Sequence, residues 1–277
     1  MSGSVLTPSD VESFKRDGVL PVRRAFELEW IELLRQGVEA DLIDPSPRFE
    51  VRLDKNSGAR YCEDYWTWSR IPQFEQFLRN SPAASLAAQL LEASRINLVM
   101  DNWFMREAGS VSRAPWHHDI AYFDFEGNMC VLWIPLEATG RDEGIEFVRG
   151  SHSWDRLFMR VFFKDHQAAQ APGWFNRKFY ELPPDIDAHR EDYDLVSFDL
   201  ELGDCLVFDI RLLHGSPAGL IPTRTRRRFT VRLAAQDGRI RYRGDWAAQE
   251  RALFEAAGHR DGDELDSEFF PRLWPVD

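Results

Sequence analysis

Trp116-His117-His118-Asp119 and, further along the chain, Leu213-His214-Gly215-Ser216 are the stretches that decide the fold and chemistry of this sequence. Together they offer two imidazoles and one carboxylate to a single divalent metal. Two histidines and one carboxylate with open coordination positions are typical of non-haem Fe(II) oxygenases. If the first stretch is a β-strand, residues i and i+2 share a face, so His117 and Asp119 point inward and His118 points away. By spacing alone, a structural histidine beside a solvated aspartate gives the same pattern, so context has to decide.

Composition limits the alternatives. The chain has 277 residues, 44% of them hydrophobic and 13% aromatic, which fits one globular domain with a large core. A net charge of −12 argues against a nucleic-acid surface. The three cysteines are scattered without a CxxC pair, and we find neither a signal-peptide pattern nor an apolar run long enough to span a membrane. We therefore expect a cytoplasmic protein without a membrane or nucleic-acid partner; the composition does not indicate an oligomeric state.

The order of elements predicts an α+β fold. Apolar spacing and capping residues predict helices near 9–18, 27–42 and 82–93, with an irregular aromatic stretch over 44–75. Short apolar, β-branched runs predict strands at 96–105, 129–136, 146–148, 205–210 and 229–233, and His214 closes an apolar strand over 206–213. We interpret the chain as a single domain, 1–277. It has a helical N-terminal part to about residue 93, a cupin-like jelly-roll core (double-stranded β-helix) over about 95–235, and a C-terminal helix near 245–257.

The segment 155–197 is too long for an ordinary connection between two strands. It carries many aromatic side chains, including Phe158, Phe163, Trp174, Phe175 and Phe179. Long excursions from compact domains are often functional lids. An insertion that packs on the outside of the barrel explains the same composition, and the sequence leaves both interpretations open.

A basic run, Arg224-Thr225-Arg226-Arg227-Arg228, leads into the last predicted core strand. Strand parity places Arg226, Arg228, Thr230 and Arg232 on one face and Arg227, Phe229, Val231 and Leu233 on the other, outside the barrel. An inward arginine after the distal histidine suits the carboxylate of a keto acid, because its planar fork pairs with carboxylate in a bidentate manner. A solvated basic turn is the alternative.

Three motifs carry a resemblance to a known family: Trp116–Asp119, Glu143-Gly144-Ile145-Glu146-Phe147-Val148-Arg149-Gly150-Ser151-His152, and Leu213–Ser216. With the opening Leu6-Thr7 and Phe14–Val19, they resemble the phytanoyl-CoA dioxygenase family of Fe(II)- and 2-oxoglutarate-dependent oxygenases over about residues 6–235. The resemblance implies that iron is bound by His117, Asp119 and His214. It also implies that Arg226 holds the C5 carboxylate of 2-oxoglutarate, with Ser216 nearby and Trp116 lining the cosubstrate pocket. Arg228 remains an alternative to Arg226.

The implied reaction uses Fe(II), 2-oxoglutarate and O₂ to hydroxylate an aliphatic C–H bond of a small molecule, with release of succinate and CO₂. A carboxylate at Asp119 favours oxygenation, because related halogenases carry a small residue there and bind chloride; desaturation, ring formation or epimerisation can follow the same hydrogen abstraction. The aromatic residues at 61–68 and 158–180 indicate an apolar or ring-bearing substrate. The alternatives are a cupin-like binding protein without oxygen chemistry, or a metal-dependent isomerase or hydrolase on the same barrel.

Overall fold

The computed structural model describes residues 6–163, 166, 168, 180–243 and 248–275, with the backbone alone for 248–250. Its helices are α1 Pro8–Asp17, α2 Leu28–Ile43, α3 Pro72–Asn80, α4 Ala83–Leu90 and α5 Ala248–Ala256. Its strands are β1 Val19–Val22, β2 Glu50–Leu53, β3 Arg60–Tyr65, β4 Ile96–Arg106, β5 Phe125–Glu126, β6 Met129–Pro135, β7 Glu146–Val148, β8 Leu195–Val196, β9 Cys205–Asp209, β10 His214–Gly215, β11 Arg226–Ala235, β12 Arg239–Ile240 and β13 Arg272–Trp274.

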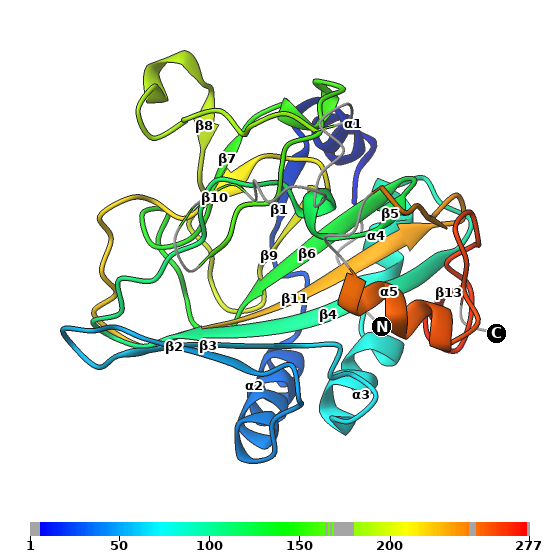
Figure 1. Ribbon diagram of the computed structural model, residues 1–277, viewed down its shortest axis with the longest axis horizontal. Helices are drawn as coiled ribbons and strands as arrows, with labels where there is room; N and C mark the ends of the chain where they lie inside the picture. The colour runs from blue at the N-terminus through cyan, green and yellow to red at the C-terminus, as the bar shows by residue number, and fades with distance from the viewer. Residues whose placement is uncertain (1–5, 164–165, 167, 169–179, 244–247, 276–277) are drawn as a thin grey trace.

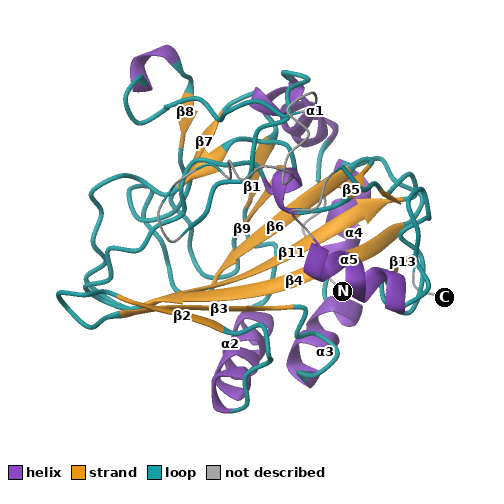
Figure 2. Ribbon diagram, in the orientation of Figure 1, coloured by secondary structure: helices purple, strands orange, loops and turns teal. Residues whose placement is uncertain are grey.

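Two facing sheets form the core, as the jelly-roll prediction requires. The large sheet runs β1-β9-β6-β11-β4-β3-β2, with β13 paired to β4, and the small sheet runs β10-β7-β8. Figure 1 shows α2 and α3 against one face of the large sheet and the small sheet on its other side. Figure 2 shows that strands dominate the centre and helices the periphery. The predicted α+β class with a cupin-like jelly-roll core and flanking helices is confirmed.

Strand β11 has one face packed against the helices and the other face directed at the space between the two sheets. Its outward residues Phe229, Val231 and Leu233 are fully buried, in one apolar cluster with helices α2 to α4. The ring of Phe229 lies 4.7 Å from that of Phe74 on α3. Its inward residues, on alternate positions, line a cavity between the sheets. The two faces predicted from parity are therefore confirmed, and the helices fix the side of the sheet on which a site can form.

The prediction that 44–75 is irregular was wrong. This stretch forms β2, β3 and the start of α3, and β2 and β3 extend the large sheet beyond β4. Strand β2 is not recognisable from its sequence pattern, because its apolar side chains face outward and its charged side chains face inward. Val51 and Leu53 are exposed, whereas Glu50 and Arg52 line the cavity. A strand that turns its charged side chains inward does not show the usual alternation of apolar core and polar surface.

Two further boundaries differ from the sequence prediction. Strand β9 ends at Asp209, and His214 lies on the separate strand β10 rather than at the end of one strand reaching residue 213. His117 makes an isolated bridge to His214, and Asp119 begins a short 3₁₀ helix, Asp119–Tyr122, instead of continuing a strand. The predicted C-terminal helix begins at Ala248, and residues 244–247 lie outside the described part of the chain.

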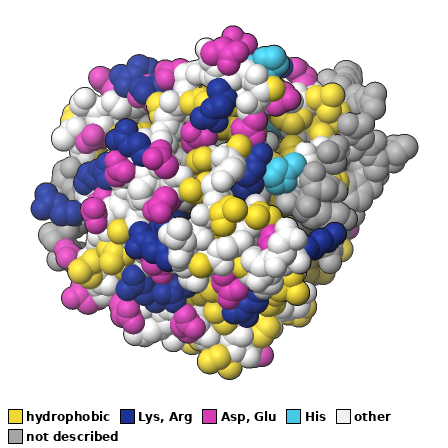
Figure 3. Space-filling model, turned by 90° about the vertical axis from the view of Figure 1, so that its left-hand side faces the viewer, with side chains coloured by type: hydrophobic (Ala, Val, Ile, Leu, Met, Phe, Trp, Pro, Cys, Tyr) yellow, Lys and Arg dark blue, Asp and Glu magenta, His cyan; other side chains and the backbone are white. Residues whose placement is uncertain are grey.

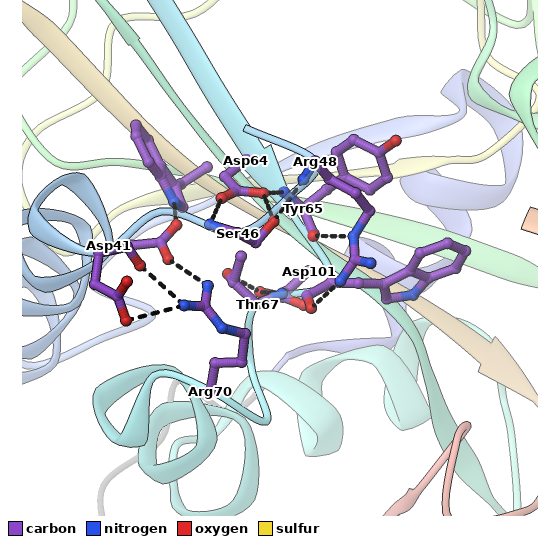
Figure 4. Close-up of polar contacts among 11 residues, drawn as sticks. Asp41, Ser46, Arg48, Asp64, Tyr65, Thr67, Arg70 and Asp101 are labelled. Atoms are coloured by element: carbon purple, nitrogen blue, oxygen red, sulfur yellow. Dashed lines mark hydrogen bonds and ion pairs between the residues drawn. The ribbon is translucent and has the colours of Figure 1, made fainter. Parts of the chain in front are cut away.

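A buried polar network fastens the N-terminal helical part to the large sheet (Figure 4). Asp64 on β3 accepts hydrogen bonds from the backbone N–H and hydroxyl of Ser46, and Asp41 on α2 accepts one from the Trp103 indole at 2.7 Å. Asp101 on β4 accepts from the Thr67 hydroxyl at 2.9 Å, and its second oxygen has no hydrogen-bond partner among the described residues. Burial raises the pKa of Asp101 to about 6. An ionised carboxylate is therefore costly at this position.

The burial of Asp101 predicts how the stability of the fold depends on pH. The raised folded-state pKa of Asp101 means that the folded protein holds this proton more tightly than the unfolded chain, so stability is lost as the pH rises from about 4 through 6. A rise from 3.8 to about 6 corresponds to about 3 kcal/mol. The variant Asp101→Asn, which cannot ionise, should gain up to that much relative to the wild type between pH 4 and pH 8. Urea unfolding at both pH values measures it; a difference that does not change with pH contradicts the assignment.

Candidate active site

The cavity between the sheets brings together the three predicted metal ligands. His117, Asp119 and His214 each offer one ligand atom, these atoms lie within 4.8 Å of one another, and all three residues are buried. Asp119 Oδ1 lies 3.4 Å from His117 Nε2 and 3.5 Å from His214 Nε2. A divalent ion with bonds of about 2 Å fits among three atoms at this spacing.

Backbone carbonyls fix the orientation of both imidazoles. The Nδ1 atom of His117 lies 2.7 Å from the Pro115 carbonyl oxygen, and that of His214 lies 2.9 Å from the Leu212 oxygen. Because a carbonyl only accepts, each Nδ1 carries the proton and each Nε2 presents a lone pair toward Asp119. This second hydrogen bond is the arrangement expected of metal-binding histidines.

Arg232 on β11 holds the far oxygen of Asp119. Its Nε and Nη2 atoms donate to Asp119 Oδ2 at 2.8 and 2.7 Å, which leaves Oδ1 directed at the histidines. Burial alone would raise the pKa of the Asp119 carboxyl, but the Arg232 guanidinium outweighs it and holds this pKa well below its usual range. Burial lowers the pKa of His214 to about 3. An ionised acid beside a neutral imidazole is the protonation state that a metal ion requires.

His118 does not join this group. Its side chain is buried, and its Nε2 accepts a hydrogen bond from the Phe158 N–H at 3.0 Å, outside the cavity wall. Burial lowers the pKa of His118 to about 4, so the ring is neutral. It points away from the cavity as expected, but into packed protein rather than toward solvent.

The residues expected around the cosubstrate separate into two groups. Arg226, Arg228 and Ser216 line the cavity, which has a volume of about 460 Å³. Trp116 does not line it: the indole donates to Asp187 Oδ1 at 2.8 Å and packs with Val148, Phe158, Ile186 and Leu213. Its ring packs behind the segment that carries His117, outside the cosubstrate pocket that the resemblance implies for it.

The two inward arginines have different surroundings. Arg226 pairs with Glu143, whereas Arg228 lies over the Trp133 ring at 4.8 Å and has only Glu137, at 3.9 Å, within ion-pair distance among the described residues. Burial lowers the pKa of Arg228 to about 9. Both residues are 4% exposed, so an anion in the cavity meets guanidinium groups that are largely shielded from bulk solvent.

Aromatic side chains form much of the remaining cavity wall, and sequence reasoning missed the charged side chains among them. Tyr122 and Phe163 lie edge-on to the His117 ring at 5.4 and 5.1 Å. An ion pair between Arg52 on β2 and Glu63 on β3 also lines this part of the cavity. Neither residue was predicted, because β2 and β3 were not recognised as strands. For Arg232, parity gave the inward direction, but nothing local indicates a partner 113 residues away.

Comparison with known proteins now gives the family. A sequence profile of the phytanoyl-CoA dioxygenase (PhyH) family matches residues 14–225, which is most of the chain.

The chain belongs to the phytanoyl-CoA dioxygenase family.

It is therefore a 2-oxoglutarate-dependent oxygenase, with Fe(II) and 2-oxoglutarate as its cofactor and cosubstrate, and the resemblance found in the sequence is confirmed. No curated protein sequence matches significantly.

Solved structures share the fold at low identity. The 2-oxoglutarate-dependent carbocyclase SnoK from nogalamycin biosynthesis is 17% identical, with a TM-score of 0.73 over 97% of this chain and 96% of that one. The epimerase SnoN, in complex with Fe³⁺, α-ketoglutarate and nogalamycin RO, is 17% identical, with a TM-score of 0.70 over 96% and 97%. EctD from S. alaskensis, with 2-oxoglutarate and 5-hydroxyectoine, is 15% identical, with a TM-score of 0.63 over 85% and 78%.

The surface carries charges of both signs. Basic and acidic side chains are interspersed over the face shown in Figure 3. No helix in the described part of the chain is long and apolar enough to cross a membrane.

The Arg232–Asp119 contact makes a prediction about metal affinity. Arg232→Gln should weaken Mn(II) binding, measured by EPR titration with Mn(II) in place of Fe(II), by about 10- to 100-fold, the range for partners that orient metal ligands. The control is Arg227→Gln, which removes the same charge from the outward face of β11, where Arg227 pairs with Glu39 and Glu137. Equal losses in both variants would mean that Arg232 acts only through stability.

Proposed function

We propose that this enzyme hydroxylates an aliphatic C–H bond of a small ring-bearing molecule, with decarboxylation of 2-oxoglutarate to succinate and CO₂. The observation that carries the proposal is the buried group His117, Asp119 and His214, oriented by hydrogen bonds and open to a cavity large enough for a second organic molecule. Cavities of this size are typical of sites for small molecules.

In this proposal the chain's own residues divide the work. His117, Asp119 and His214 hold the metal through Nε2, Oδ1 and Nε2, and Arg232 keeps the acid ionised and aimed. Bound Fe(II), with 2-oxoglutarate and O₂, supplies the oxidising power for C–H cleavage. Tyr122, Phe163 and the other aromatic side chains exclude water from the reacting carbon.

We place the C5 carboxylate of 2-oxoglutarate at Arg226, with Ser216 beside it. Arg226 is on the inner face of β11, twelve residues after His214. Ser216 lies in the cavity wall two residues after His214, with its hydroxyl 3.4 Å from the Ala114 N–H. Arg228, two residues further along the same face, remains the alternative, because no carboxylate of the described residues lies closer to it than 3.9 Å.

The substrate occupies the half of the cavity lined by rings in this proposal. The walls there comprise Tyr61, Tyr65, Phe104, Tyr122, Phe123 and Phe163. Stacking and edge contacts from such walls favour a flat or ring-bearing molecule. The Arg52–Glu63 pair supplies polar groups for a hydroxyl or carbonyl of that molecule. Arg160, Val161, Phe162 and Phe163 bring the 155–197 segment into the wall, which supports its role as a lid; Trp174, Phe175 and Phe179 lie outside the described residues.

Ring formation or epimerisation of a similar molecule is the second candidate. It is favoured by the overlap with the carbocyclase SnoK and the epimerase SnoN, which extends over 96–97% of each chain, whereas the overlap with EctD covers 85% and 78%. Both outcomes begin with the same hydrogen abstraction. Mass spectrometry of the product separates them, since hydroxylation adds 16 mass units, ring closure removes two hydrogens and epimerisation leaves the mass unchanged.

The metal assignment predicts a loss of function without a loss of fold. His117→Ala and His214→Ala should abolish both the visible charge-transfer band that anaerobic Fe(II) and 2-oxoglutarate produce and the release of succinate. Ser216→Ala, in the same wall but not a metal ligand, should keep the band at saturating 2-oxoglutarate. A wild-type protein that gives no band would favour a cupin-like binding protein or a metal-dependent isomerase instead.

The cosubstrate assignment predicts a change in affinity. Arg226→Ala should weaken 2-oxoglutarate binding to the Fe(II)-loaded protein by about 1.5–3 kcal/mol, the range for hydrogen bonds to charged groups. Titration of the charge-transfer band measures the dissociation constant. A larger loss in Arg228→Ala would transfer the role to Arg228.

A further inference from the structure

Glu143 places a carboxylate among the arginines at one end of the cavity. Its Oε1 accepts a hydrogen bond from Arg226 Nη2, and its Oε2 lies 3.8 Å from Arg224 Nη2. Its charge also acts on Arg228, where it opposes the lowering of the pKa that burial causes. Glu143 therefore occupies a position where three arginine side chains favour an anion.

The two partners of the Arg226–Glu143 ion pair differ in how firmly the surrounding structure holds them. Arg226 is the first residue of β11 and pairs with Arg106 of β4, and its side chain is 4% exposed. Glu143 lies on the turn between β6 and β7, and its side chain is 31% exposed. Besides the arginines, its carboxylate accepts only a 3.2 Å hydrogen bond from Gly140 N–H within the same turn, among the described residues. If the pair separates, the glutamate is the partner that moves.

We propose that Glu143 is an internal competitor for 2-oxoglutarate: it neutralises Arg226 when the cosubstrate is absent and gives way to the C5 carboxylate when the cosubstrate binds. This inference rests on the proposed function, because it takes Arg226 as the cosubstrate arginine. Succinate carries the same carboxylate, so the return of Glu143 to Arg226 also helps the product to leave.

The sign of the effect distinguishes this role from a structural one. Two carboxylates at one guanidinium repel each other, so a glutamate that competes weakens the binding of both 2-oxoglutarate and succinate. A glutamate that merely orients Arg226 strengthens their binding. Removal of the Glu143 charge should therefore tighten both ligands if it competes and loosen both if it only orients.

The test compares Glu143→Gln with Asp142→Asn, a neighbouring substitution that removes the same charge from an exposed position of the same turn. Dissociation constants for 2-oxoglutarate come from the charge-transfer band of the anaerobic Fe(II) protein, and those for succinate from calorimetry. We expect Glu143→Gln to tighten both ligands by about three- to fivefold, the scale of one partly exposed ion pair. Asp142→Asn should change either constant less than twofold, and the gain should shrink as ionic strength rises.

The double variant Arg226→Gln/Glu143→Gln completes the test. Its 2-oxoglutarate affinity should equal that of Arg226→Gln alone, because the competition requires the arginine. Weaker or unchanged binding in Glu143→Gln, or a gain that survives in the double variant, overturns the inference. If the wild-type protein binds no 2-oxoglutarate at all, the proposed function itself fails, so the two failures are distinguishable.

Discussion

The arrangement of this site depends on one buried carboxylate with two different neighbours. Asp119 Oδ2 is held by the Arg232 guanidinium, while Oδ1 faces the lone pairs of His117 and His214. Without a cation, burial would favour the neutral acid; with Arg232, the acid is ionised and points in one direction. Because His117 and His214 also exchange backbone hydrogen bonds, at 2.9 and 2.8 Å, all three side chains are positioned by groups that need no metal. The site is therefore preorganised for an ion.

Strand β11 connects this chemistry to the fold. Its outward residues join the apolar cluster with α2 to α4, and its inward residues present Arg226, Arg228, Thr230 and Arg232 to the cavity in order. One end of the row meets Asp119 and the other meets Glu143. The helices thus stabilise the site indirectly, because packing against Phe229 and its neighbours fixes which face of β11 points inward. The hydrogen bond from Thr67 to Asp101 also holds β4, the partner strand of β11, against the segment that precedes α3.

Much of the fold and of the metal site could be predicted from the sequence, at positions where residue spacing and side-chain chemistry indicate the same arrangement. The alternation along 226–233 depends on local spacing and predicted which side chains face the cavity, whereas the HxD motif and the distal histidine were linked by ligand chemistry, two imidazoles and one carboxylate for one metal. Elements with inverted polarity were not readable: β2 turns Glu50 and Arg52 inward, so its pattern resembles a surface loop. Contacts between distant segments were not readable either. The Arg232–Asp119 and Trp116–Asp187 pairs depend on the three-dimensional closure of the barrel, and Trp116 consequently lies outside the cavity that the family resemblance assigned to it.

The most direct test of the account is a crystal structure of the Fe(II)-loaded protein, with anomalous diffraction measured at the iron edge. The account predicts one strong peak about 2.0–2.3 Å from His117 Nε2, Asp119 Oδ1 and His214 Nε2, with Asp119 Oδ2 still on Arg232. A peak bound by other residues, or an iron-saturated crystal without a peak at these three atoms, would contradict it.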